Sequence, residues 1–131
     1  MSQYTFGLTI DGDLEEVRER VIAALGKEGF GVLTEIDVSA TMKAKLDKDI
    51  PPYRILGACN PPLAFDAISA DPKIGALLPC NVVVRQVDDE VAIDFMDPYA
   101  VLALVDLPDI EELAAEVRGR LDKVKAALTV T

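Results

Sequence analysis

The sequence predicts a single-domain α+β protein whose elements follow the order β-α-β-β-β-β-α. Five segments alternate apolar and polar residues or are rich in β-branched residues, which is typical of strands. Two longer segments repeat apolar residues at helical spacing behind acidic residues that can cap a helix. A chain of 131 residues has the size of one domain, residues 1–131. The simplest packing is an antiparallel or mixed sheet that carries both long helices on one face.

The first strand is expected over residues 4–10, where aromatic and aliphatic residues alternate with small ones. Asp13, followed three residues later by Glu16, forms a capping box that starts an amphipathic helix. Apolar residues continue at helical spacing to Leu25, after which glycines supply the stop signals.

The middle of the chain predicts a strand over residues 32–38 and one or two helical turns over residues 40–46. A mostly apolar strand follows over residues 53–58. Asn60 and Pro61 then start another helix, because asparagine caps the first turn and proline lacks an N–H that would be unpaired there.

The C-terminal half predicts a turn over residues 73–79 and a hairpin of two strands over residues 80–87 and 90–96. A cap followed by proline starts a short helical turn after the hairpin. The last helix is expected to begin at Asp109 and to keep one face apolar as far as Leu128.

Two helices can cover only one face of this sheet. The strand segments over residues 53–58 and 81–87 are apolar on both sides, so water is a poor neighbour for the other face. We therefore expect the protein to associate with itself through that face or an adjacent edge, as a homodimer.

Composition excludes several classes of function. A formal net charge of −10 repels phosphate backbones and acidic membrane surfaces. The absence of histidine removes Ser–His and Cys–His pairs and imidazole metal ligands. No run of residues is apolar enough to span a bilayer, and the first residues do not form a secretory signal. We expect a cytoplasmic protein with neither nucleic acid nor membrane among its partners.

The only two cysteines are each followed by asparagine, as Cys59-Asn60 and Cys80-Asn81. Cys59 precedes a predicted helix start, where the positive end of the helix favours a thiolate. If folding brings Cys80 close, the two thiols could form a reversible redox pair, or a metal site completed by oxygen ligands or a second subunit. The alternative is that both are ordinary buried residues, since cysteine is often buried and no CxxC motif is present.

Three neighbouring side chains complete the candidate set. Asn81 either pins the preceding turn to the backbone or lines a pocket beside Asn60. Tyr53 and Arg54 precede the first cysteine segment, and one of them should point to the sheet face that Ile55 does not occupy. An arginine and a phenol near two amides could hold a small anion; a surface arginine and a core tyrosine are equally consistent with the pattern.

Residues 53–64 (YRILGACNPPLA) and 74–84 (IGALLPCNVVV) closely resemble the signature of the domain-of-unknown-function family 302. Residues 31–37, the turn at residues 96–98 and the closing helix are also similar to that family. The resemblance implies a small α+β domain, similar to the TATA-binding-protein-like architecture and dimeric. It implies no established activity, cofactor or substrate, and DNA binding is not carried over, because fold does not determine function and the charge is unsuitable.

We therefore expect an accessory, non-enzymatic domain that binds a small ligand or a protein partner, although the sequence leaves catalysis open. The candidate site residues are Tyr53, Arg54, Cys59, Asn60, Cys80 and Asn81. One alternative is a thiol-dependent redox or sulfur-handling protein that uses Cys59 and Cys80; another is a purely structural assembly module. No catalytic residue, metal ligand or cofactor is assigned.

Overall fold

The computed structural model describes residues 3–129 and contains a five-stranded antiparallel sheet in the order β1-β5-β4-β3-β2. The strands are β1 (Thr5–Asp11), β2 (Gly31–Asp37), β3 (Tyr53–Cys59), β4 (Cys80–Val87) and β5 (Glu90–Met96). The helices are α1 (Leu14–Lys27), α2 (Val38–Leu46), α3 (Pro61–Ala70), the 3-10 helix η1 (Pro72–Leu77), α4 (Pro98–Leu102) and α5 (Ile110–Thr129). The predicted α+β class and order of the main elements are confirmed, and the sheet is antiparallel throughout.

Side-chain caps start several helices where the sequence predicts them. The Asp13 carboxylate accepts a hydrogen bond from the Glu16 N–H at 3.1 Å and starts α1. The Asn60 amide oxygen accepts from the Leu63 N–H at 3.3 Å and starts α3. These bonds satisfy N–H groups that have no partner within the helix.

Two segments differ from the prediction. Helix α2 begins at Val38 rather than residue 40, because the Asp37 carboxylate accepts from the Ala40 N–H at 2.9 Å and caps it earlier. The segment predicted as a turn over residues 73–79 is largely the 3-10 helix η1, which the Asp71 carboxylate caps through the Lys73 N–H at 3.1 Å. In both cases an aspartate supplies the cap.

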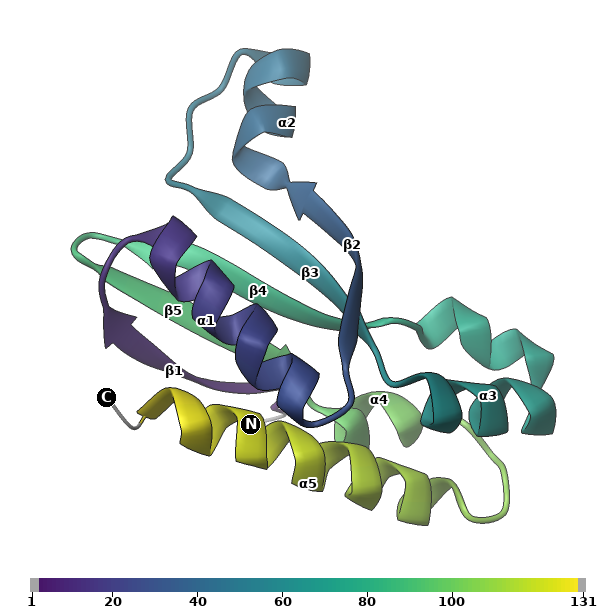
Figure 1. Cartoon of the computed structure of the whole chain (residues 1–131). Helices are drawn as coiled ribbons and strands as arrows, with labels where there is room; N and C mark the ends of the chain where they lie inside the picture. Colours follow the sequence, from purple (N-terminus) through teal and green to yellow (C-terminus); the bar gives the residue numbers. More distant parts are fainter. Residues whose placement is uncertain (1–2, 130–131) are drawn as a thin grey trace.

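Helices α1 and α5 lie across the same face of the sheet, as Figure 1 shows. They run antiparallel, and an arginine side chain of each helix donates a hydrogen bond to a backbone carbonyl at the C-terminal end of the other. Arg20 of α1 donates to the Leu128 carbonyl at 3.2 Å, and Arg120 of α5 donates to the Glu28 carbonyl at 3.1 Å. A guanidinium at a helix C-terminus also offsets the negative end of the helix dipole. The core lies between these helices and the sheet and includes Val17, Leu25, Leu56, Val84, Ile93, Phe95, Leu121 and Val124.

The strand register separates two faces of the sheet. Leu8, Ile93, Val84 and Arg54 are partners across four neighbouring strands and point towards α1 and α5. The next row turns to the opposite face, which we call the open face. It contains Ile36, Ile55 and Val83, and Ile36 is 50% exposed.

Strand β3 connects two different ends of the molecule. Helix α2 precedes it and stands away from α1 and α5 (Figure 1), with no buried residue. Helix α3 and η1 follow it; α3 contacts α5, and η1 packs against α3. Within residues 3–129, no helix is both long and apolar enough to cross a membrane.

Candidate functional site

An apolar pocket of about 320 Å³ lies where β3 ends and β4 begins. Ala58 of β3 is the register partner of Cys80 of β4, which brings the two cysteine segments together at one end of the sheet. Cys59, Asn60 and Cys80 all line the pocket. Apolar residues of α3, η1, α4 and α5 supply much of its remaining wall, among them Leu63, Ala67, Ile74, Leu102 and Val117.

Asn60 is the polar side chain of this pocket, and it is 8% exposed. Its amide oxygen caps α3, and its carbonyl oxygen accepts from the Ala64 N–H at 2.9 Å. Pro61 and Pro62 occupy the first turn and have no N–H. The N–H groups at the start of α3 are therefore either missing or already bonded, so this helix start does not offer the usual binding site for an anion.

Both cysteines are free thiols, and both are partly buried. Burial in the apolar pocket, with a smaller contribution from the charge of Cys59, raises the pKa of the Cys80 thiol to about 11. Near neutral pH the Cys80 thiol is therefore protonated, and it lines the wall as a small polarisable group.

Two glycines allow the close packing around these segments. A Cβ at Gly57 would lie 2.2 Å from Thr34 Oγ1 and 2.8 Å from Cγ of Pro79, another residue of the pocket wall. Gly29 has a φ of +84°, and a Cβ there would lie 2.9 Å from Asn60 Nδ2. Gly29 therefore combines a left-handed conformation with the space that the Asn60 amide occupies.

The other sequence-predicted candidates lie elsewhere. Asn81 is exposed on β4 opposite Gly57 and does not line the pocket. Tyr53 and Arg54 are at the opposite end of β3, and Arg54 is about 16 Å from Cys59 along the strand. Arg54 points to the helix-covered face, away from the face of Ile55, as the alternation predicts. The structure brings together Cys59, Asn60 and Cys80, and leaves the other three apart.

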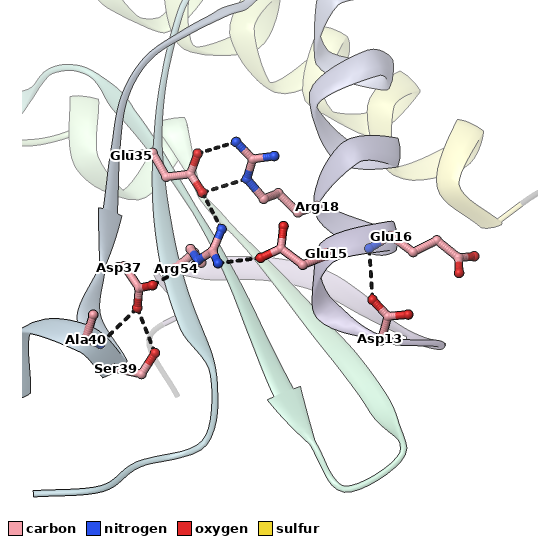
Figure 2. Close-up of polar contacts among 9 residues, drawn as sticks. All are labelled: Asp13, Glu15, Glu16, Arg18, Glu35, Asp37, Ser39, Ala40 and Arg54. Atoms are coloured by element: carbon pink, nitrogen blue, oxygen red, sulfur yellow. Dashed lines mark hydrogen bonds and ion pairs between the residues drawn. The ribbon is translucent and has the colours of Figure 1, made fainter. Parts of the chain in front are cut away.

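Arg54 instead belongs to an ion cluster that the sequence did not indicate, shown in Figure 2. We define this cluster as Glu15 and Arg18 of α1, Glu35 and Asp37 of β2, and Arg54 of β3. Arg18 Nε donates to Glu35 Oε2 at 2.6 Å, and Arg54 Nη1 donates to the same oxygen at 2.9 Å. Arg54 also pairs with Glu15 and lies 3.5 Å from Asp37.

The ion cluster is saturated with its own contacts. The hydrogen bond from Arg18, followed by that from Arg54, lowers the pKa of the Glu35 carboxyl below its usual value. Each guanidinium contacts at least one carboxylate of the cluster, so neither presents a free fork for a ligand anion. Among the described residues, no group of three or more histidine, cysteine, aspartate or glutamate side chains could hold a metal ion.

Sequence signals existed for some of the missed residues. The segment predicted as a turn contains Ile74, Leu77 and Leu78, which is more apolar than a solvated turn requires, and all three line the pocket. Glu35 and Asp37 alternate on one face of β2, but Arg18, the partner of Glu35, lies 17 residues before it on another element. Only the packing of α1 against β2 reveals that contact.

Comparisons with known proteins agree on family and fold. The family model described as "Domain of unknown function DUF302" matches residues 6–128. A crystal structure of an uncharacterized conserved protein DUF302 from Bacillus stearothermophilus is similar, with a TM-score of 0.89 and 27% sequence identity. The alignment covers 97% of this chain and 99% of that chain. No curated protein matches the chain significantly.

Proposed function

The chain belongs to the DUF302 family, and we propose that it is an accessory binding module whose small ligand occupies the pocket at the end of β3. The observation that carries this proposal is the pocket itself: about 320 Å³ of space with a wall that is apolar apart from Asn60 and two thiols. Ligand pockets in proteins are concave and mostly apolar, with a few polar groups that orient the ligand. A dry apolar cavity of about 150 Å³ accepts benzene, so this pocket is large enough for a molecule bigger than one aromatic ring.

The edge of the pocket also favours an apolar ligand. Leu33 and Ile68 line the pocket and are 67% and 43% exposed. Removing such side chains from water on binding is favourable, by about 25 cal/mol for each Å² of apolar surface that is buried. A ligand that fills the pocket would cover part of both side chains.

A neutral solvatochromic dye, Nile red, tests the proposal. We expect its fluorescence to rise on binding to the wild-type protein. The rise should be lost in Ala64→Phe, which adds a ring to the pocket wall, and kept in Ala70→Phe, an exposed position of the same helix outside the wall. If the dye does not bind the folded wild-type protein, or if both variants bind it equally, the binding role is wrong and a structural assembly module becomes the better reading.

The proposal includes a homodimer in the cytoplasm, formed through the open face. The support is an apolar row across three strands, Ile36, Ile55 and Val83, in which Ile36 is half exposed. Light scattering coupled to size-exclusion chromatography should give twice the mass of one chain. Ile36→Asp should reduce it to the monomer mass, whereas Leu104→Asp, at another exposed apolar position, should not. A monomeric wild-type protein would contradict this part of the proposal.

A thiol-dependent redox role is the second candidate, because Cys59 and Cys80 line the same pocket. In that role the two thiols would lose two protons and two electrons to an oxidant such as oxidised glutathione and form a disulfide. The raised pKa of Cys80 disfavours this reaction near neutral pH. Mass spectrometry after mild oxidation decides: an internal disulfide supports the redox role, and two free thiols exclude it.

A further inference from the structure

The pocket has one unusual polar feature. Among the residues that line it, Asn60 is the only one whose side chain carries a nitrogen or oxygen atom. The others are aliphatic, aromatic, glycine, proline or sulfur-containing residues. Any directional contact between a side chain and a bound molecule therefore falls to Asn60 or, more weakly, to the two thiols.

The oxygen of the Asn60 side-chain amide accepts a hydrogen bond, whereas its nitrogen donates none to the described residues. Its oxygen caps α3 through the Leu63 N–H at 3.3 Å. Within residues 3–129, its nitrogen donates no hydrogen bond, although the residue is only 8% exposed. This nitrogen is not among the fully buried side-chain atoms that lack a partner, so it keeps contact with solvent; it lies 2.9 Å from the position that a Cβ at Gly29 would take. The bonded oxygen fixes the orientation of the amide, so Nδ2 is the group that remains available.

The charge of the surroundings limits the acceptor that Nδ2 can meet. No lysine, arginine, aspartate or glutamate lines the pocket. The first turn of α3 has no spare N–H, because Pro61 and Pro62 lack one and Leu63 and Ala64 already donate to Asn60. Arg120, whose Nη1 lies beside the same Gly29 position as Nδ2, is already bonded to the Glu28 carbonyl and the Glu116 carboxylate. An ionised ligand group would therefore lose its water here without a free compensating charge, which is strongly unfavourable. A neutral oxygen, such as that of a ketone, aldehyde or ester, has a much smaller desolvation cost.

We propose that the ligand of this pocket is an uncharged molecule, apolar except for one carbonyl-type hydrogen-bond acceptor, and that Asn60 Nδ2 donates to that acceptor. This inference rests on the proposed binding function of the pocket. It assigns Asn60 two separate roles, one for each half of its amide: the oxygen holds the start of α3, and the nitrogen selects the ligand.

Three small molecules of the same shape test the ligand class. Acetophenone carries a neutral carbonyl, cumene replaces its oxygen by a methyl group, and benzoate replaces its methyl group by a charged oxygen. Affinities are measured by displacement of Nile red from the wild-type protein. We expect benzoate to be the weakest competitor, because its charge has no partner in the pocket. Benzoate as the tightest competitor would overturn the proposal.

The variant Asn60→Ser separates the two roles of the amide. Serine is about as good an N-cap as asparagine, so α3 should persist, but its shorter side chain has no amide nitrogen. We expect the affinity ratio of acetophenone to cumene to fall by about 3- to 10-fold in this variant, the effect of losing one net hydrogen bond. In the wild-type protein, acetophenone but not cumene should shift the side-chain amide resonances of Asn60.

The outcomes separate this inference from the proposed function. If Nile red, acetophenone and cumene bind but Asn60→Ser leaves their affinity ratio unchanged, the pocket binds ligands and the role of Nδ2 is wrong. If neither Nile red nor any of the three molecules binds, the proposed function fails and the inference fails with it. A reduced ratio in Asn60→Ser, with an unchanged circular dichroism spectrum, supports both.

Discussion

Both ends of β3 carry polar side chains, but the two ends differ in the hydrogen-bond and ion-pair partners that these side chains have. At the N-terminal end, Arg54 belongs to the ion cluster, in which two arginines and three acidic residues contact one another (Figure 2). At the C-terminal end, Cys59 and Asn60 face an apolar pocket, and half of the Asn60 amide has no partner among the described residues. The cluster has more charge, but the pocket contains the amide nitrogen that has no partner among the described residues.

This comparison shows why charged residues alone are a poor guide to a binding site. A guanidinium already paired with carboxylates must lose those contacts before it can bind a ligand. When a ligand covers an apolar wall and removes it from water, the free energy of the system falls. The two ends should therefore respond to different perturbations: the pocket end to added volume and alkaline pH, and the cluster end to acid and salt.

The largest effect is expected from added volume beside the pocket, in Gly57→Ala. The new Cβ would lie 2.2 Å from Thr34 Oγ1 and 2.8 Å from Cγ of Pro79, so the pocket wall must move. We expect a loss of about 2–3 kcal/mol in the free energy of unfolding, as for other overpacked sites, measured by urea denaturation. Gly31→Ala is the matched control, because a Cβ there has no neighbour within 4 Å. Equal stability of the two variants would show that close packing around Gly57 does not limit the stability of the protein.

The next effect is an alkaline one, also at the pocket. The pKa of Cys80 is raised from 9.0 to about 11, so folding favours the protonated thiol. The resulting stabilisation is fully present below pH 9 and is lost as the pH rises through about 11. We expect Cys80→Ala to remove roughly 2 kcal/mol of this alkaline dependence, seen as a flatter curve of unfolding free energy against pH. Identical curves for the variant and the wild type would mean that Cys80 is not desolvated.

An acidic effect is expected at the ion cluster, in Glu35→Gln. Arg18 holds the pKa of Glu35 below its ordinary 4.5, so the stabilisation is present above that pH and is lost as the pH falls through the lower, folded-state pKa. The Glu35 side chain is 23% exposed, so solvent screens its ion pairs. We therefore expect the free energy of unfolding of the wild type to exceed that of the variant by about 1 kcal/mol at neutral pH. Thermal unfolding should show this gap closing in acid, with Nile red affinity at neutral pH unchanged. A difference in unfolding free energy that stays the same as the solution is acidified would contradict this prediction.

The difference between the two ends also explains what could be predicted from the sequence. Helix starts at Asp13 and Asn60 depend on residues only three positions apart, so local chemistry was sufficient. The meeting of Cys59 with Cys80 depends on the register of Ala58 with Cys80, which neighbouring residues do not encode.

Nearness in the sequence was also a misleading guide. Tyr53 and Arg54 belong to the same short stretch of sequence as Cys59, but an extended strand places them at its far end. Strand β2 is the clearest case: its apolar Ile36 faces the open side, while Glu35 faces α1, because Arg18 and Arg54 provide partners there. A charge can turn inward where another element pairs with it, and alternation alone does not reveal that pairing.

The smallest effect is expected from salt, and it separates the two ends without any further mutation. Raising the ionic strength from about 0.1 M to about 1 M shortens the Debye length from about 10 Å to about 3 Å and weakens partly exposed ion pairs. The stability gap between wild type and Glu35→Gln should therefore shrink by a few tenths of a kcal/mol, measured by urea denaturation at both salt concentrations. The difference in unfolding free energy between Gly31→Ala and Gly57→Ala should stay constant, because steric overlap does not depend on ionic strength. If salt reduced both gaps equally, the pocket end would also depend on charge, and the contrast between the two ends of β3 would not hold.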